Sequence, residues 1–254
     1  MKLRGKVAIV SGGGGAIGRA IALKLAGAGA NVAVLDIRED VALAVSDEVR
    51  ALGVSSTAHA VDIRNYEAVR ACVDGIAETF GGIDIVVNSA GGSARSRMDL
   101  FEKLDIEVFD WMIDVNLRGP MYIIHAALPH LIKRNAGKIV NIASIVALGG
   151  KAKCVDYASA KGGILAATKS LAIELGRYNI NVNAVSPGLV QREAPADPEA
   201  FAQRFSVLNR IGTQDDIAHV VMFLASPESD YITGQNYVVD GGRSLGLKGD
   251  GERG

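Results

Sequence analysis

Short apolar runs alternate with longer amphipathic segments along most of the chain. The runs are almost continuously hydrophobic, as in KVAIVSG at residues 6–12 and NVAVLD at residues 31–36, and they end at small or polar residues. Strands that are buried on both faces of a parallel sheet have this pattern. Later runs repeat it: IDIVVNSAG (83–91), GKIVNIAS (137–144), NINVNAVSPG (179–188) and NYVVDGG (236–242).

Helical patterns occupy the intervals between these runs. We expect helices over residues 17–29, 41–52, 68–80, 108–134, 157–177 and 215–225. Alternating strands and helices predict the α/β class, with a doubly wound parallel sheet that carries helices on both faces. Ligands of such sheets bind beyond the carboxyl ends of the strands, so the residues that close each apolar run are where a site is expected.

The composition predicts one domain. The chain has 254 residues, 49% of them hydrophobic, and no linker-like segment rich in Pro or Ser divides it. We therefore predict a single domain over residues 1–245. The glycine-rich charged tail over residues 246–254 is expected to be loosely held.

Charge and cysteine content narrow the possible partners. The 27 Lys and Arg residues are balanced by 28 Asp and Glu residues, so the net charge of −1 attracts neither nucleic acid nor an anionic membrane. Cys72 and Cys154 form no metal or redox motif, which predicts no metal site and a reducing, cytoplasmic location. The first apolar run stops at Ser11, too early for a signal peptide or membrane span. Small ligands and protein partners are the remaining candidate partners.

The stretch SGGGGAIG after the first run fits two glycine patterns. Gly13, Gly15 and Gly18 satisfy G-x-G-x-x-G, whereas a shift of one residue begins the pattern at Gly12 and places Ala16 where a glycine is usual. A glycine turn between a strand and a helix lets the backbone approach a phosphate and directs free N–H groups at it. Either register therefore predicts a dinucleotide site.

Asp36 indicates which dinucleotide is bound. It closes the second run, 18 residues after Gly18, near the interval of about 20 residues expected for a carboxylate that binds the adenosine ribose. Such a carboxylate would repel the 2′-phosphate of NADP, so NAD is favoured. Arg38 offers that phosphate a partner, although a solvated arginine beside Glu39 and Asp40 is the simpler interpretation.

Four further residues form a catalytic pattern. Tyr157 and Lys161 in YASAK are four residues apart, so they share one face of a helix. A phenol with an ordinary pKa of about 10 needs a nearby cation to act as a base at neutral pH. Ser144 ends another apolar run, where its hydroxyl can hold a substrate oxygen. Asn116 lies in a helical stretch, where asparagine is mildly unfavourable and a polar task is more plausible.

Together these motifs resemble the short-chain dehydrogenase/reductase family, and the resemblance extends from Lys6 to Gly242. Its marks are SGGGGAIG, VDIRN, NSAG, the set Asn116, Ser144, Tyr157 and Lys161, SPG at residues 186–188, and YITGQNYVVDGG. The resemblance implies a Rossmann-like fold and hydride transfer at the nicotinamide C4. It further implies that Tyr157 is the acid and base, that Lys161 binds the nicotinamide ribose and lowers the tyrosine pKa, that Ser144 orients the substrate oxygen, and that Asn116 supports a proton-relay water.

The resemblance also implies the cofactor site and favours the shifted glycine register. Its residues are Gly12, Gly15, Ala16, Ile17, Gly18, Asp36, Asp62, Ile63, Asn88, Ala90, Gly91, Tyr157, Lys161, Pro187, Gly188 and Val190. Ala16 is harmless if its backbone is helical and strained if φ is positive. Ser11 and Ser89 replace a Thr and an Asn of the family motifs, and Gln191 and Arg192 stand near a position where the family commonly has Thr.

We therefore predict an NAD-dependent oxidoreductase that interconverts a secondary alcohol and a ketone and forms a homo-oligomer, a dimer or tetramer. One alternative is a 3-oxoacyl-[acyl-carrier-protein] reductase, against which Asp36 argues because that resemblance implies NADP. Another is a non-catalytic redox sensor, which would not need all four catalytic residues. Arg95 and Arg192 are candidate anchors for an anionic substrate, although solvated arginines paired with Asp99 and Glu193 are the favoured interpretation.

Overall fold

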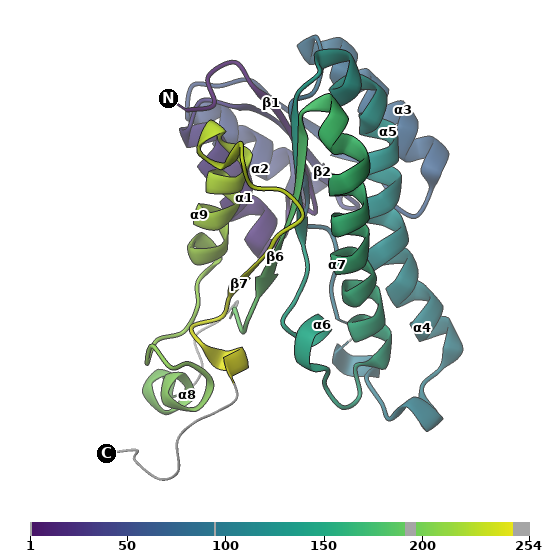
Figure 1. Cartoon of the computed structure of the whole chain (residues 1–254), viewed down its shortest axis with the longest axis vertical. Helices are drawn as coiled ribbons and strands as arrows, with labels where there is room; N and C mark the ends of the chain where they lie inside the picture. The colour runs from purple at the N-terminus through teal and green to yellow at the C-terminus, as the bar shows by residue number, and fades with distance from the viewer. Residues whose placement is uncertain (1, 94, 191–196, 246–254) are drawn as a thin grey trace.

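The computed structural model describes residues 2–93, 95–190 and 197–245. Seven parallel strands form one sheet in the order β3-β2-β1-β4-β5-β6-β7 (Figure 1). The strands are β1 (Val7–Ser11), β2 (Asn31–Asp36), β3 (Ser56–Ala60), β4 (Ile85–Asn88), β5 (Gly137–Ile142), β6 (Ile180–Pro187) and β7 (Asn236–Val239). The predicted fold class is confirmed, including helices on both faces.

Two layers of helices enclose the sheet. The helices α1, α2 and α9 cover one face of the sheet, and α3, α5 and α7 cover the other, as Figure 1 shows. Their apolar side chains pack against the strands. The helices are α1 (Ala16–Gly27), α2 (Glu39–Ala51), α3 (Tyr66–Phe80), α4 (Ile106–Ile113), α5 (Gly119–Arg134), α6 (Val146–Gly149), α7 (Val155–Leu175), α8 (Pro198–Phe205) and α9 (Gln214–Ala225).

The strand order reverses between β1 and β4. After β1 the chain adds β2 and β3 on one side, and then crosses to place β4 on the other side of β1. Ser11 and Asn88, the last residues of β1 and β4, lie opposite each other in the ladder. Ligands of open α/β sheets bind at such a reversal, so the fold directs attention to this part of the carboxyl edge.

The expected single helix over residues 108–134 is wrong in one respect. A π-helical turn (Asp114–Arg118) separates α4 from α5, and Asn116 lies within it. Turns of this kind are rare and occur frequently at functional sites, because the extra residue changes the direction of neighbouring side chains.

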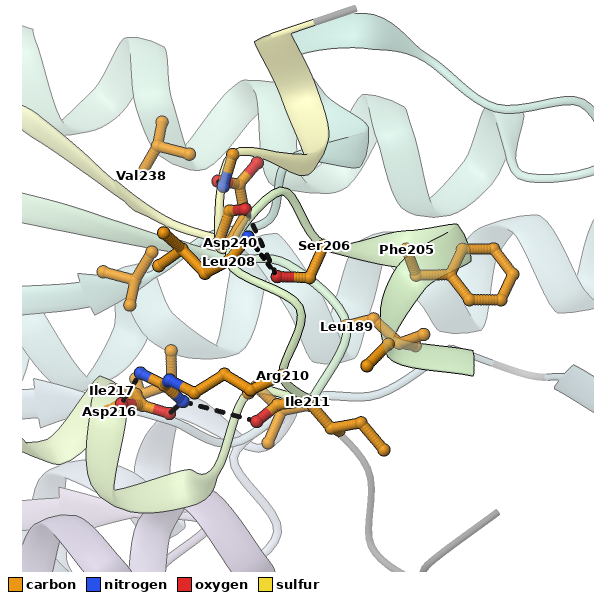
Figure 2. A pocket seen from close by; sticks show the side chains of 16 residues that line it. Leu189, Phe205, Ser206, Leu208, Arg210, Ile211, Asp216, Ile217, Val238 and Asp240 are labelled. Carbon is orange, nitrogen blue, oxygen red and sulfur yellow. Dashed lines mark hydrogen bonds and ion pairs between the residues drawn. The ribbon is translucent and has the colours of Figure 1, made fainter. Parts of the chain in front are cut away.

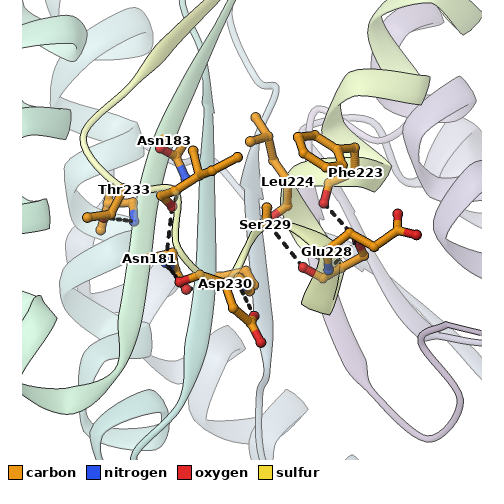
Figure 3. A network of polar contacts seen from close by, with 12 residues as sticks. Asn181, Asn183, Phe223, Leu224, Glu228, Ser229, Asp230 and Thr233 are labelled. Atoms are coloured by element: carbon orange, nitrogen blue, oxygen red, sulfur yellow. Dashed lines mark hydrogen bonds and ion pairs between the residues drawn. The ribbon is translucent and has the colours of Figure 1, made fainter.

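The strand β7 lies at the edge of the sheet, and two asparagines of β6 hold the segment before it. Asn181 Nδ2 donates to the carbonyls of Asp230 at 2.9 Å and Ile232 at 3.0 Å, as Figure 3 shows. Asn183 Nδ2 also donates to Ile232 O at 2.9 Å, while its Oδ1 accepts from Gln235 N at 3.0 Å. These contacts fix the position at which β7 begins, and therefore the position at which it ends at the carboxyl edge.

Candidate active site

The turn between β1 and α1 is built for glycine. Gly12 has φ +64°, and a Cβ there would lie 2.6 Å from Ala90 Cα. A Cβ on Gly18 would clash with Gly12 O. The glycines at both ends of the shifted register are therefore required by close backbone contact, which is what a turn that admits a phosphate needs.

Ala16 is accommodated without strain. It is the first residue of α1, and it is not among the non-glycine residues with positive φ. No side chain caps this helix start, and Gly15 and Ala16 are exposed. The first N–H groups of a helix have no partner within it, so this end of α1 offers donors to an anion.

The carboxylate of Asp36 lies against the glycine turn. Its Oδ2 accepts a hydrogen bond from Gly14 N at 3.1 Å, and its Oδ1 accepts one from Arg38 N at 3.2 Å. These bonds orient the carboxylate at the end of β2.

Asp62 and Ile63 follow β3 on the adjoining part of the edge. The Asp62 carboxylate forms an ion pair with Arg64, with Nη2 at 2.6 Å from Oδ2, and this hydrogen-bonded contact lowers the pKa of Asp62. Ile63 is buried over Gly119, where a Cβ would lie 2.6 Å from Ile63 Cδ1. An apolar side chain is thereby fixed at this part of the edge.

A buried chain of amides joins β4 and β5 to α7. Asn88 Nδ2 donates to Asn141 Oδ1 at 2.9 Å, and Asn141 Nδ2 donates to Thr168 Oγ1 at 3.0 Å. The Oδ1 atom of Asn88 is buried without a hydrogen-bond partner. Asn141 and Thr168 are not among the predicted site residues, although an asparagine inside the apolar run KIVNI is a signal that points to Asn141.

Asn116 binds the loop that follows β4. Its Oδ1 accepts from Gly92 N at 3.0 Å, and its Nδ2 donates to Gly92 O and to Met112 O, both at 3.1 Å. A Cβ on Gly91 would lie 2.6 Å from Asn116 Oδ1 and 3.3 Å from Lys161 Nζ. The π-helical turn, the loop after β4 and α7 therefore converge on one point.

Lys161 is buried beside Tyr157 on α7. Its Nζ donates to Ile142 O at 2.8 Å and lies 5.9 Å from the centroid of the Tyr157 ring. Burial lowers the pKa of Lys161 to about 8. The structure thus brings Lys161 and Asn116 together at Gly91, with the Tyr157 ring next to Lys161 Nζ.

Ser144 lies between the end of β5 and the start of α6. Its Oγ accepts from Val146 N at 3.2 Å, so its O–H hydrogen remains available to donate. The next residue, Ile145, donates its N–H to Pro187 O at 3.2 Å, which ties this turn to the end of β6. The helix α6 packs against α7, which carries Tyr157.

The end of β6 approaches the end of β7. Gly188 N donates to Val239 O at 2.9 Å, and a Cβ on Gly188 would lie 2.5 Å from Asp240 Cβ. Val190 forms a parallel bridge with Gly212. Pro187, Gly188 and Val190 are therefore on the same edge of the sheet as the predicted catalytic residues.

The proposed substrate arginines are less well placed by the structure. Arg95 lies in a 3₁₀ turn (Arg95–Arg97) after β4, and Arg192, with Gln191 and Glu193, lies outside the described residues. Asp99 forms a 3.9 Å ion pair with Lys153. The expected tail over residues 246–254 is also outside the described part of the chain.

A cavity of about 330 Å³ opens beside the ends of β6 and β7, and sequence analysis did not foresee it. Figure 2 shows the Arg210–Asp216 ion pair at one end and Phe205 at the other. Ser206 Oγ donates to Gly241 O at 3.3 Å and joins the end of α8 to the chain after β7. The apolar walls of the cavity include Leu189, Val190, Leu208, Ile211, Ile217, Val238 and Val239.

Neither a metal cluster nor a membrane-spanning helix is found among the described residues. No group of three or more His, Cys, Asp or Glu side chains is placed to hold a metal ion. Among the same residues, no helix is both long enough and apolar enough to cross a membrane.

Comparisons with known proteins agree on one family. The family model described as "Enoyl-(Acyl carrier protein) reductase" matches residues 14–244. The chain is 38% identical to a "(2S)-[(R)-hydroxy(phenyl)methyl]succinyl-CoA dehydrogenase subunit BbsD" of Thauera aromatica, covering 96% of this chain and 99% of that one. It is 36% identical to a cyclohexanol dehydrogenase of Acinetobacter sp. (94% and 95% covered) and 33% identical to a 3-oxoacyl-[acyl-carrier-protein] reductase of Thermotoga maritima (95% and 99%).

Solved structures show the same similarity. The NAD⁺-bound xylitol dehydrogenase aligns with a TM-score of 0.88 at 31% identity, covering 95% of this chain and 100% of that one. The carveol dehydrogenase of Mycobacterium avium in complex with NAD aligns with a TM-score of 0.89 at 30% identity, with 96% and 99% covered.

Proposed function

Because this chain belongs to the short-chain dehydrogenase/reductase family, we propose that it is an NAD-dependent oxidoreductase that interconverts a secondary alcohol and a ketone. The relatives bear the names of dehydrogenases and reductases, which supports an oxidoreductase. The proposal rests on one observation of this chain: Lys161 Nζ lies beside the Tyr157 ring on one side and near Gly91, which Asn116 also approaches, on the other. A proton-transfer centre needs a cation next to its acid and base.

The cofactor site fits a dinucleotide. The turn from Gly12 to Gly18 excludes side chains, and the uncapped start of α1 presents N–H groups to a pyrophosphate. Asp36 would bind the adenosine ribose, and Ile63 would cover the adenine. Lys161, deeper in the site, would bind the nicotinamide ribose. When bound, the nicotinamide supplies the hydride acceptor or donor.

The preference for NAD rests on Asp36. Its carboxylate is held by Gly14 N and Arg38 N, so it cannot move away from a 2′-phosphate without losing both hydrogen bonds. A like charge at this position disfavours NADP. Two of the similar solved structures contain NAD, which supports the same choice.

The proton step is assigned to Tyr157. Its phenolic oxygen would take the hydroxyl proton of the alcohol during oxidation and return it during reduction. The Lys161 ammonium favours the ionised phenol, because a cation near the ring stabilises a phenolate. Ser144, whose oxygen already accepts from Val146 N, would donate its hydrogen to the substrate oxygen and hold it beside Tyr157.

A 3-oxoacyl-[acyl-carrier-protein] reductase remains the second candidate. Relatives of that name are 33% and 36% identical to this chain, and the same residues would perform that chemistry. The two candidates differ in substrate and in cofactor. Asp36 favours NAD and therefore the alcohol dehydrogenase, because the acyl reductase implies NADP. If the chain is a non-catalytic redox sensor, it should turn over no substrate.

We expect the chain to form a homo-oligomer. Large apolar side chains are exposed on α4 and α7, among them Ile106, Trp111 and Ile173, the last 84% exposed. Two more are Tyr231, which precedes the edge strand β7, and Val238, which lies in it. Exposed apolar groups on helices and on a sheet edge suit contacts between copies. Sedimentation at micromolar concentration tests this; a monomer would contradict it.

The test of the proposed function is a panel of secondary alcohols, sugars and matching ketones with NAD(H) and NADP(H), followed at the absorbance of the reduced nicotinamide. We expect turnover with higher kcat/KM for NAD, and loss of turnover in Tyr157→Phe. An acetoacetyl thioester reduced with NADPH in preference to every alcohol would favour the acyl reductase. Dinucleotide binding without turnover on any substrate would favour the sensor.

A further inference from the structure

Arg243 carries a positive charge that the described chain does not neutralise. It begins a 3₁₀ turn (Arg243–Leu245) after β7, and its guanidinium carbon lies 4.6 Å from the centroid of the Phe205 ring. Its Nη1 atom is buried without a hydrogen-bond partner. Stacking on the ring fixes the plane of the guanidinium, so its donors are oriented before a ligand arrives.

The nearest carboxylate in the sequence, that of Asp240, accepts from backbone N–H groups. Asp240 Oδ1 accepts from Gly242 N at 2.8 Å, and Oδ2 accepts from Ser244 N at 2.7 Å. Among the described residues, no carboxylate forms an ion pair with Arg243, whereas Arg210 is paired with Asp216. A guanidinium that no carboxylate neutralises keeps N–H donors for an anion, which would form charge-assisted hydrogen bonds with them.

Arg243 lies on the same edge of the sheet as the catalytic groups. Neighbouring strands lie about 4.8 Å apart, so the ends of β5 and β7, separated by β6, are about 10 Å apart. Direct contacts run along this edge, from Ile145 N to Pro187 O and from Gly188 to Asp240. An anion at Arg243 and a reacting oxygen at Ser144 can therefore belong to one molecule.

The cavity of about 330 Å³ lies beside Arg243. The cavity is lined by Phe205, on whose ring the Arg243 guanidinium stacks. It is also lined by Gly241 and Gly242, which precede Arg243 in the chain. Its other walls are largely apolar, and its size suits a small ligand. These walls would cover a hydrocarbon segment next to a charged end.

We propose that Arg243, stacked on Phe205, is an anion site that binds the carboxylate or phosphate of the substrate at the end remote from the reacting oxygen. This inference rests on the proposed function and gives it a substrate class: a secondary alcohol or ketone whose apolar chain ends in an anionic group. The guanidinium forms a bidentate contact with two oxygens of that group, and the contact orients the chain toward Ser144 and Tyr157.

The kinetic test compares 7-oxooctanoate with the neutral 2-octanone, and 5-oxohexanoate with 2-hexanone. Wild type is expected to prefer each carboxylate by about ten-fold or more in kcat/KM, as a hydrogen bond to a charged group provides. Arg243→Gln removes that preference, mainly through KM, and leaves the neutral ketones within about two-fold. Arg243→Lys restores part of it, because an ammonium keeps the charge but not the planar fork.

Arg177→Gln is the matched control. The guanidinium of Arg177 also stacks on an aromatic ring, 4.9 Å from the centroid of Tyr178. Arg177 directly precedes β6, so it lies at the amino ends of the strands, opposite the carboxyl edge that carries the site. This variant keeps the wild-type preference for carboxylates. Equal losses for charged and neutral ketones in Arg243→Gln, or an equal effect of Arg177→Gln, would overturn the proposal.

A binding measurement separates this inference from the proposed function. Heptanedioate, titrated into the protein without turnover, raises the melting temperature of wild type and of Arg177→Gln but not of Arg243→Gln. That result without turnover of any ketone supports the anion site and overturns the proposed function. Turnover of neutral ketones with no preference for carboxylates and no heptanedioate effect overturns the anion site alone. A melting shift with inorganic phosphate but not heptanedioate also overturns it, because the site would then bind a free ion.

Discussion

Asn116 and Gly92 exchange a pair of hydrogen bonds, with Gly92 N donating to Asn116 Oδ1 at 3.0 Å and Asn116 Nδ2 donating to Gly92 O at 3.1 Å. The amide thereby acts as a clamp between the π-helical turn and the loop after β4. The Asn116 side chain is fully buried, so both of its polar atoms depend on these partners. The loop that contains Gly91, next to Lys161 Nζ, is held by this clamp.

Asn116→Ala removes the clamp and leaves the N–H and C=O of Gly92 without these partners. We expect a loss of about 1–3 kcal/mol in the free energy of unfolding and a lower kcat, because the loop beside Lys161 is no longer fixed. Urea denaturation and steady-state kinetics measure the two effects. Asn116→Asp keeps the Oδ1 acceptor but turns a carboxylate oxygen toward Gly92 O and Met112 O, so it should not recover the stability. Unchanged stability in the alanine variant would show that water replaces the amide.

Tyr157→Phe removes only the phenolic hydroxyl. If Tyr157 transfers the proton, kcat falls by about 10²- to 10⁴-fold, while NADH binding, followed by fluorescence, stays close to that of wild type. Tyr178→Phe is a control of identical chemistry on the far edge of the sheet and should leave kcat unchanged. A Tyr157→Phe enzyme that retained most of its activity would require another acid and base.

Asp36→Asn tests the charge at the end of β2 separately from its shape. The amide oxygen can still accept from Gly14 N, so the glycine turn should keep its conformation while the negative charge is lost. The ratio of kcat/KM for NAD to that for NADP should fall by about ten-fold or more, since a like-charge contact is removed. A wild type that already prefers NADP would contradict the role given to Asp36.

The fold was predictable because its strongest signals are local. Continuous apolar runs mark β1, β2, β4, β5 and β6, each of which is buried on both faces. The strand β3 was not foreseen, because STAHA belongs to an edge strand and is only partly buried, so its hydrophobic run is short. The π-helical turn around Asn116 adds one residue to a helix without any change in composition that the sequence reveals.

The residues of the site also differ in whether local sequence signals predict that they lie together. Tyr157 and Lys161 lie on one helix, so their spacing alone places them together. The contact of Phe205 with Arg243 joins segments 38 residues apart in the sequence, and only the packing of α8 on the chain after β7 creates it. The chain from Asn88 through Asn141 to Thr168 is likewise visible only after the strands have been ordered.

Gly12→Ala and Ala16→Gly form a contrasting pair in the glycine turn. A Cβ on Gly12 meets the backbone of Ala90 at 2.6 Å, and φ is +64°, so the substitution should weaken NAD binding severely and lower the melting temperature. Ala16→Gly should alter the KM for NAD little and cost at most about 1 kcal/mol of stability, because Ala16 already has helical backbone. A large gain in NAD affinity in Ala16→Gly would reveal strain at that position.

Lys161 should leave a signature in the pH dependence of stability. Burial lowers its pKa from the ordinary value of 10.5 to about 8 in the folded protein. Below about pH 8 the ammonium is charged in both states, so folding buries a charge and is penalised. Between pH 8 and 10.5 the unfolded chain still binds the proton that the folded protein releases, so the free energy of unfolding rises with pH through this window.

The penalty corresponds to about 3 kcal/mol, and Lys161→Met should remove it. The variant is expected to be more stable than wild type near neutral pH by up to about that amount, with the gap closing as the pH approaches 10.5. Urea denaturation of both proteins across this range measures the gap, and the difference between them cancels the titration of tyrosines and cysteines. The same variant should lose activity, because the cation beside Tyr157 is gone. A gap that stays constant with pH would mean that Lys161 titrates at its ordinary value, and the lowered pKa would have to be abandoned.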